Sequence, residues 1–330
     1  MTEPSPHRLP ATLSPSHYDL RLAPDLDGAT FSGEEEVAVT VHEPTSTVVL
    51  HALDLDIAEA WFEQGGRRLT AAASLDAEAE TATLTLDAPL EAGPATFHAR
   101  FAGVLNDLLV GFYRSTFTAD DGTVRTIACT QFESTHARRA FPCWDEPAHK
   151  ASFAITLDVP ADLLAVSNAA EASREPLPDG RVRVRFAPTM VMSTYLVAFV
   201  VGPLEATEPV DVGGVPLRVI APLGKLDLAG FALEVGAFSL RFLADWYAIA
   251  YPGDKLDLVA VPDFSFGAME NLGCVTFRET LLLVDDAHAT SPSCRTSPTG
   301  GPTRSPTWGS AAWAPWSAPP MRLTSTRCRR

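Results

Sequence analysis

Between Tyr18 and Gly202 the sequence is a succession of short apolar or alternating runs separated by proline, glycine and aspartate. Such runs are typical of strands, and no helical period long enough for a βαβ crossover interrupts them. The clearest are HYDLRLAPD, EEEVAVTVHE, STVVLHALDLDI, TATLTLDAP, ATFHARFAGVL, ASFAITLDVP, GRVRVRFAP and STYLVAFVVG. The sequence therefore predicts a mainly β N-terminal domain over residues 1–202, built as a β-sandwich or as saddle-like antiparallel sheets.

The period of the apolar residues changes after residue 203. Between Leu226 and Trp246 they recur at spacings of three and four, and Pro252 follows the run, which predicts one long, mostly buried helix over about residues 226–249. LDLVAVPDF and GCVTFRETLLLVD, which come next, are typical of strands. Since 330 residues suffice for two cores, we expect a second domain of α+β type over residues 203–290.

The composition changes again near residue 291. Residues 291–330 hold six arginines, seven prolines and thirteen serines or threonines, with no aspartate or glutamate. Neither the strand period nor the helix period continues there, so a packed structure is not expected. Two interpretations remain open: a basic, disordered tail, or a segment that is not the one the gene originally encoded.

Net charge and cysteine usage narrow the class of protein. The net charge of −16 argues against nucleic acid or an anionic membrane as the main partner. The five cysteines show no CxxC spacing and predict reduced thiols rather than a disulfide framework or a cysteine zinc site. No signal-like segment and no run of about 18 apolar residues is found, which predicts a cytoplasmic protein. The sequence does not indicate an oligomeric state.

Two segments carry the motifs that point to chemistry. GAMEN, Gly267–Asn271, follows VPDFSF, and QFESTHARRAFPCWDEPAHKASFAITLDVP spans Gln131–Pro160. With GFYRS at 111–115 and MSTYLVAFVVG at 192–202, they give a pattern that resembles the zinc metalloaminopeptidases of the aminopeptidase N type, the M1 or gluzincin family, over about residues 12–290. The resemblance implies that the second domain is the start of a thermolysin-like catalytic domain, and that the activity is removal of N-terminal residues from peptides.

The same resemblance implies a substrate-binding site. Its expected members, from the two motif segments, are Gln131, Glu133, Gly267, Ala268, Met269, Glu270 and Asn271. Glu133 and Glu270 would hold the free amino group of a peptide, with Gln131 beside them. Gly267 and Ala268 would let the substrate backbone approach closely, and Met269 and Asn271 would shape the wall.

Physical chemistry supports carboxylates in this role. A primary ammonium carries a positive charge and three donors, so converging carboxylates can form charge-assisted hydrogen bonds with it. At an effective dielectric constant of ~20 and a separation of about 3 Å, one such pair gains about 5 kcal/mol before desolvation. The alternative for Glu270 is a solvated carboxylate at a strand end. Within ARRAFPCWDEPAHK a structural role is expected, with Arg138, Arg139, Asp145 and Glu146 pairing locally.

The metal site that the resemblance implies is missing from the sequence. In the family, two histidines four residues apart on a helix bind zinc with a downstream glutamate, and a glutamate between the histidines acts as general base. None of the eight histidines here lies four residues from another. We therefore assign no residue to metal binding or catalysis and expect the chain as given to be inactive.

Three hypotheses of different classes remain open. The first is an aminopeptidase N-like enzyme of which this chain keeps the N-terminal part. The second is a β-rich module that binds peptide amino termini without cleaving them. The third is an unstable fragment, because a truncated catalytic domain leaves apolar helix surface uncovered at about 25 cal/mol per Å².

A frameshift near residues 291–297 accounts for the missing zinc motif. Codons compatible with Pro302–Thr307, when read one nucleotide earlier, can spell His-Glu-Ile-Ala-His. Resequencing the DNA around codons 288–305 should therefore reveal this motif one base out of frame. An in-frame tail with no such motif in the neighbouring frame would refute the frameshift.

Overall fold

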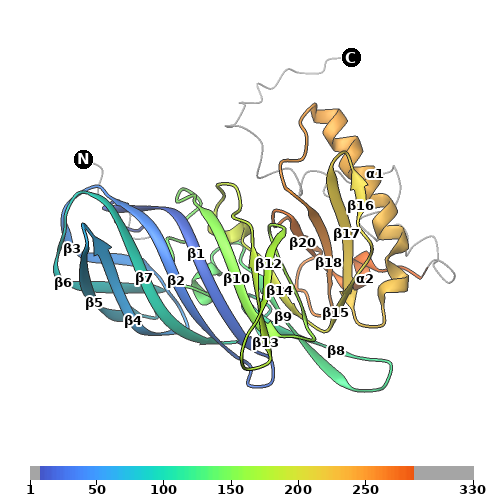
Figure 1. Cartoon of the computed structure of the whole chain (residues 1–330), viewed down its shortest axis with the longest axis horizontal. Helices are drawn as coiled ribbons and strands as arrows, with labels where there is room; N and C mark the ends of the chain where they lie inside the picture. Colours follow the sequence, from blue (N-terminus) through green and yellow to red (C-terminus); the bar gives the residue numbers. More distant parts are fainter. Residues whose placement is uncertain (1–7, 286–330) are drawn as a thin grey trace, which may run out of the picture.

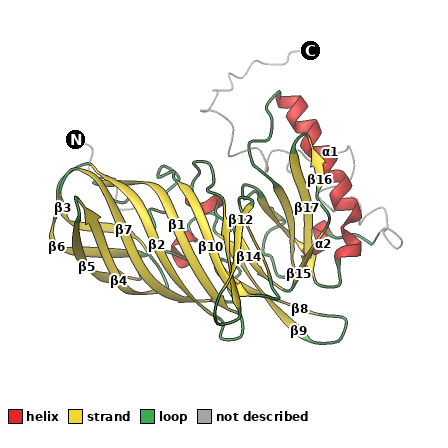
Figure 2. Cartoon of the chain, in the orientation of Figure 1, coloured by secondary structure: helices red, strands yellow, loops and turns green. Residues whose placement is uncertain are grey.

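The computed structural model describes residues 8–285, which form three β-sheets and one long helix (Figures 1 and 2). The mainly β architecture that the strand-like runs predict is confirmed. The predicted disordered tail, residues 291–330, lies outside the described residues.

A curved ten-stranded sheet makes up most of the N-terminal part (Figure 1). Its order is β12-β13-β10-β1-β2-β7-β4-β5-β6-β3. β1 and β10 pair in parallel, and the other pairings in the sheet are antiparallel. In chain order the strands are β1 (Leu13–Asp25), β2 (Thr30–Val41), β3 (Thr45–His51), β4 (Leu55–Gln64), β5 (Arg67–Asp76), β6 (Thr81–Leu90), β7 (Gly93–Val104), β10 (Ser152–Pro160), β12 (Glu171–Pro176) and β13 (Arg181–Phe186).

A smaller sheet packs against the inner face of the large one. Its order is β11-β14-β9-β8, made of β8 (Gly111–Thr118), β9 (Val124–Gln131), β11 (Leu164–Ser167) and β14 (Phe199–Gly202). Along β2 buried and exposed residues alternate, so that Phe31 faces inward. The rings of Phe31 and Phe112 lie 5.1 Å apart, and Phe112 contacts Phe199 at 4.8 Å. These aromatic contacts join the two sheets into a sandwich-like core.

The third sheet begins after Pro203 and, unlike the first two sheets, has a core of parallel strands. It comprises β15 (Leu204–Ala206), β16 (Val210–Val212), β17 (Val215–Pro222), β18 (Leu256–Val261), β19 (Ala268–Met269) and β20 (Cys274–Arg278). Strands β17, β18 and β20 are parallel, and helix α1 (Gly230–Tyr247) connects the first two of them. This βαβ unit marks a change of architecture near residue 203, although the division into domains 1–202, 203–290 and 291–330 stays a prediction.

Helix α1 is less buried than its periodicity indicates. The expected helix begins with a 3-10 turn, η3 (Leu226–Ala229), and its buried residues include Gly236 and Leu240. Phe238, Phe242 and Trp246 instead form a row of stacked rings that are 62%, 49% and 71% exposed. The prediction of a mostly buried helix was therefore wrong, because apolar residues occupy two faces and only the face with small residues packs on the sheet.

Two predicted strands contain short helices. Residues 194–196 in STYLVAFVVG form the 3-10 turn η2 (Thr194–Leu196), and residues after β20 form α2 (Glu279–Leu282). At η2, the backbone N–H groups of Leu196 and Val197 donate to carbonyls three residues earlier, as in a 3-10 turn. The Thr194 hydroxyl donates to Asp145 at 2.6 Å. At α2, Glu279 pairs with Lys225 at 2.6 Å. Both side-chain contacts are long-range and carry no local sequence signal.

The charged residues of ARRAFPCWDEPAHK pair as predicted in one case and differently in two. Arg138, in the 3-10 turn η1 (Ala137–Arg139), donates to Asp145 at 3.0 Å. Arg139 pairs with Asp54, and Glu146 accepts from Arg8 and from the backbone of Leu9. The expectation of purely local pairing was wrong for Arg139 and Glu146, since segments distant in sequence bring closer partners.

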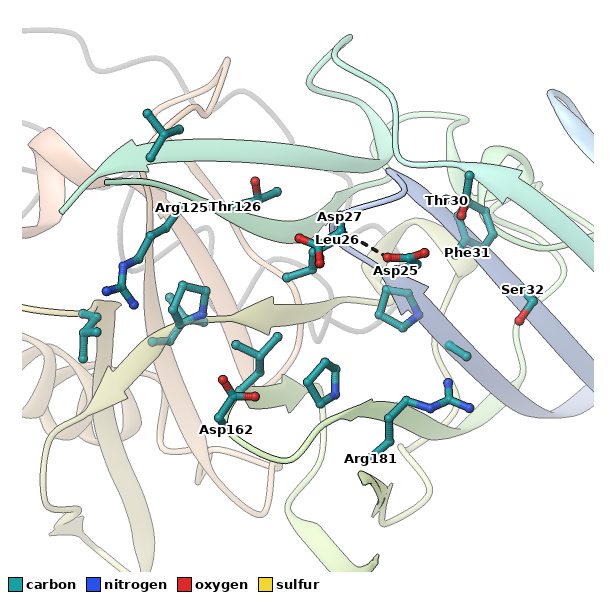
Figure 3. Close-up of a pocket in the computed structure, with 18 of the residues that line it drawn as sticks. Asp25, Leu26, Asp27, Thr30, Phe31, Ser32, Arg125, Thr126, Asp162 and Arg181 are labelled. Carbon is teal, nitrogen blue, oxygen red and sulfur yellow. Dashed lines mark hydrogen bonds between the residues drawn. The ribbon is translucent and has the colours of Figure 1, made fainter. Parts of the chain in front are cut away.

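An open groove of about 1230 Å³ lies where the turn after β1 meets the β8–β9 hairpin and the start of the third sheet (Figure 3). Asp25 caps that turn by accepting from the backbone of Asp27. Arg125 and Arg181 reach the groove from different strands (Figure 3). None of the described residues that line it is a predicted site residue.

The third sheet is fixed to the rest at a buried polar junction. Lys255, 5% exposed, donates from Nζ to the carbonyl oxygens of Ser167 and Gly273 and to the carboxylate of Asp257. Gly273 has φ +67°, and a Cβ atom there would lie 2.0 Å from the carbonyl oxygen of Asn168. The two parts thus approach so closely that only glycine fits at this position.

We predict that Gly273→Ala lowers the free energy of unfolding by about 3 kcal/mol, since left-handed strain and a backbone clash add together. Gly213 is a matched control, because its φ is +65° and a Cβ atom there would have nothing within 4 Å. Gly213→Ala should cost only about 1 to 2 kcal/mol. Denaturant unfolding measures both, and equal losses would show that the approach to Asn168 carries no cost.

Candidate functional site

Glu270 directly follows β19, in the turn of the hairpin that β19 forms with β20. Arg278 fastens this hairpin: its Nε donates to the carbonyl of Phe264 at 3.0 Å and its Nη2 to that of Ser265 at 2.8 Å. Its backbone N–H donates to the carbonyl of Gly267 at 3.0 Å. A single arginine therefore fixes the backbone just before Glu270.

The remaining GAMEN residues lie along β19 and the turn that follows it. β19 is the last strand of the third sheet, and within residues 8–285 no strand pairs with its outer edge. Gly267 is exposed and Ala268 half-buried, whereas Met269 and Asn271 are both 1% exposed. Asn271 donates to the hydroxyl of Thr276 at 3.3 Å. Backbone at an edge strand offers unpaired N–H and C=O groups to a further strand.

Gln131 and Glu133 come from the end of β9 in the four-stranded sheet. Gln131 is 1% exposed, and neither its amide oxygen nor its amide nitrogen has a hydrogen-bond partner among the described residues. Buried amides are nearly always paired, so this one is a candidate for binding a ligand. Glu133 is exposed and precedes a cis peptide bond to Ser134.

The charge of Glu133 acts on Glu270, although the two residues follow strands of different sheets, β9 and β19. The pKa of the half-buried Glu270 is raised, mainly by burial and in addition by the negative charge of Glu133. Among the described residues neither carboxylate forms an ion pair with a lysine or arginine. Two like charges that lack an internal cation favour a positively charged ligand between them.

Tyr195 belongs to the same neighbourhood and was missed by the sequence reasoning. It lies in η2, and its pKa is raised by burial, then by the charge of Glu270, then by that of Glu133. The motif MSTYLVAFVVG contains this residue, but nothing in its spacing singles out the tyrosine from the apolar residues around it. Only the fold brings its phenol within the influence of the two negative charges.

Metal binding finds no support in the described part of the chain. Over residues 8–285, no group of three or more histidine, cysteine, aspartate or glutamate side chains converges in a way that could hold an ion. Two carboxylates and a phenol suit an organic cation, which donates several hydrogen bonds at once.

Two protein-family models match the chain. The model of the peptidase M1 N-terminal domain matches residues 14–196, and the model of the peptidase family M1 domain matches residues 231–297. The chain belongs to peptidase family M1. Both motif segments, with Glu133 and Glu270, fall within the matched ranges, and the match confirms the resemblance drawn from them.

Relatives from distant organisms share this part of the molecule. The chain is 44% identical over 279 residues to aminopeptidase M1-C of Oryza sativa subsp. japonica and 43% identical over 288 residues to aminopeptidase M1 of Arabidopsis thaliana. It is 41% identical over 281 residues to puromycin-sensitive aminopeptidase of Caenorhabditis elegans. These alignments cover 84%, 86% and 84% of this chain but only 31%, 32% and 30% of the relatives. The chain spans about a third of the M1 relatives it matches.

Membrane-spanning helices are not found in the part of this M1 chain that the structure describes: no helix there is both long enough and apolar enough to cross a bilayer.

The raised pKa of Glu270 predicts a pH-dependent effect on stability. The folded chain keeps this proton at a pH where the unfolded chain has released it, so stability falls as the pH rises through that window. Glu270→Gln should thus stabilise the fold at pH 7, by less than about 1 kcal/mol because the side chain is half-exposed. The gain should shrink below about pH 4.3, where the carboxyl is protonated in both states.

Urea unfolding at both pH values measures this effect. Glu208→Gln is the control, since Glu208 is exposed and distant in sequence from the site, and it should change stability little at either pH. A stabilisation by Glu270→Gln that persists undiminished at low pH would show that the charge is not its cause.

Proposed function

We propose that this chain forms the part of an M1 aminopeptidase that recognises the free amino group of a peptide, with Glu133 and Glu270 as its ligands. The observation that carries the proposal is the pair of uncompensated carboxylates: burial raises the pKa of Glu270, and repulsion by Glu133 raises it further. An ammonium bound between them relieves the repulsion and satisfies both acids. An internal peptide bond carries no such charge, so the site selects chain ends.

The neighbouring groups suit an extended peptide. The unpartnered amide of Gln131 offers a donor and an acceptor beside the carboxylates. The free edge of β19 can pair with a substrate backbone, and the exposed Gly267 permits close approach. In this proposal Ala268 is part of the β19 edge that pairs with the substrate, and the buried Met269 and Asn271 hold that strand in place from the interior.

Hydrolysis is not assigned to the chain as given. Aminopeptidases of family M1 are in general zinc metallopeptidases, yet the described residues do not fit a zinc ion, because no suitable set of ligands converges. We therefore propose that the chain binds peptide amino termini without cleaving them. We propose a frameshift that begins near residues 291–297; this position and the tail after it, to residue 330, lie outside the described residues.

The alternative is a stand-alone module that binds the same class of peptides and is not part of an enzyme. The row Phe238, Phe242 and Trp246, exposed among residues 8–285, favours the first view, because a contiguous exposed apolar surface is typical of an interface with further protein. Peptides with a free amino terminus are the proposed partners in both cases. A cytoplasmic location, and the absence of nucleic-acid and membrane partners, stay predictions from composition.

Calorimetric titration with alanyl-alanine and its N-acetylated form tests the proposal. The free dipeptide should bind, and acetylation should weaken binding at least about tenfold because the charge and two donors are lost. Glu270→Gln should weaken binding of the free dipeptide by a similar factor, while Glu208→Gln should leave it unchanged. Equal affinity for the two peptides would remove the role given to Glu133 and Glu270.

A second measurement separates the enzyme from the binder. With an alanyl chromogenic amide and added zinc, the purified chain should release no chromophore. Clear turnover that depends on the added metal would overturn the assignment of a purely binding role.

A further inference from the structure

The three segments that carry Glu133, Tyr195 and Glu270 are not joined by strand pairing. Glu133 follows β9, Tyr195 lies in η2, and Glu270 belongs to the hairpin of the third sheet. The described strands of the third sheet pair only with one another. Something other than the β-ladders must therefore set the separation of the two carboxylates.

We propose that Asn168, a buried residue outside both motif segments, positions Glu270 relative to Tyr195 and Glu133. This inference rests on the proposed function for its consequence in binding, although the positioning itself can be measured without any ligand. Asn168 does not contact the substrate in this proposal; it acts by holding the backbone on both sides of the site.

The hydrogen bonds of Asn168 span the two sides directly. Its Nδ2 donates to the carbonyl of Leu196, next to Tyr195, at 2.8 Å, and to the carbonyl of Leu272, two residues after Glu270, also at 2.8 Å. Its Oδ1 accepts from the backbone N–H of Ala198 at 2.8 Å. Both amide hydrogens are thus used, and the residue is 2% exposed.

Neighbouring contacts leave this bridge little freedom to shift. Lys255 binds the carbonyls of Ser167 and Gly273, which directly precede Asn168 and follow Leu272. The backbone of Gly273 lies so close to the Asn168 carbonyl that a Cβ would stand 2.0 Å from it. The side chain of Asn168 and the backbone around it therefore move as one unit.

Asp145 completes the connection on the side of Glu133. Its carboxylate accepts from the hydroxyl of Thr194 at 2.6 Å and from Nε of Arg138 at 3.0 Å. Arg138 lies in η1, a few residues after Glu133. A continuous set of buried bonds thus runs from the Glu133 loop through Asp145 and η2 to Asn168 and on to the GAMEN hairpin.

The geometry of the amino-group site depends on this set of bonds. Displacement of a binding group by about 1 Å is enough to change affinity or rate by large factors. Loss of the Asn168 amide leaves the carbonyls of Leu196 and Leu272 without this donor, so the two backbones lose the bond that fixes their separation beside Tyr195 and Glu270, even though Lys255 still joins the two sides.

The test measures the electrostatic coupling of Glu133 to Glu270 by carbon-13 NMR of the glutamate carboxyl groups. In the otherwise unchanged chain, Glu133→Gln should lower the pKa of Glu270, because one like charge is removed. In the Asn168→Ala background the same substitution should change that pKa much less. No peptide is present, and a general loss of stability does not by itself alter this difference.

Binding of alanyl-alanine provides the second readout. Asn168→Ala should weaken it about tenfold or more. Ser115→Ala is the matched control, because the Ser115 hydroxyl also bridges between the two parts, accepting from the backbone of Asp263 at 2.9 Å, but at a residue before β19 rather than in the turn that holds Glu270. It should leave both the coupling and the affinity unchanged. If Asn168→Ala does not fold, Asn168→Ser retains one donor and should give intermediate losses.

The outcomes distinguish the two proposals. If the unchanged chain does not bind the dipeptide but the coupling is lost in Asn168→Ala, the amino-group function fails and the positioning role stands. If the coupling is the same in both backgrounds, Asn168 does not position the site, whatever the binding result. Equal effects of Ser115→Ala and Asn168→Ala would likewise overturn the proposal, since docking of the third sheet in general would then be responsible.

Discussion

The buried polar contact between the third sheet and the sandwich-like core is the constraint on which the rest of the structure depends. In this contact Lys255 donates hydrogen bonds to three acceptors, and Asp257 compensates its charge. Gly273 allows the two backbones to approach closely. A buried lysine is stable only when it is paired and fully hydrogen-bonded, so the junction admits one arrangement rather than a range. The junction therefore also fixes the relative positions of the two segments that carry the carboxylates of the site.

Local patterns predict the architecture because they report on neighbours in sequence. The alternation in β2, with Phe31 inward and Glu34 outward, is visible in the letters alone and predicts the sheet. The period of α1 predicts a helix, but it does not tell which of two apolar faces packs on β17 and β18. The small residue Gly236 decides this, since a Cβ there would lie 2.9 Å from Leu258.

In the candidate site, too, some residues can be predicted from local sequence and others only from the fold. Glu133 and Glu270 could be named from the two motif segments, and the fold brings them into electrostatic contact, while their roles stay predictions. Tyr195 and Asn168 could not be named, because they belong to the site through hydrogen bonds and charges that cross between segments far apart in sequence. The strand predicted through Thr194 was wrong as well, since the backbone there bonds within its own 3-10 turn while the Thr194 hydroxyl reaches the distant Asp145.

The aromatic row on α1 has a consequence for the life of this polypeptide in a cell. Stacked rings of Phe238, Phe242 and Trp246 are the kind of surface that chaperones and quality-control proteases engage on incompletely assembled proteins. Where no further protein surface covers these rings, they are a site for aggregation or for recognition by quality control, whatever the acidic pair binds.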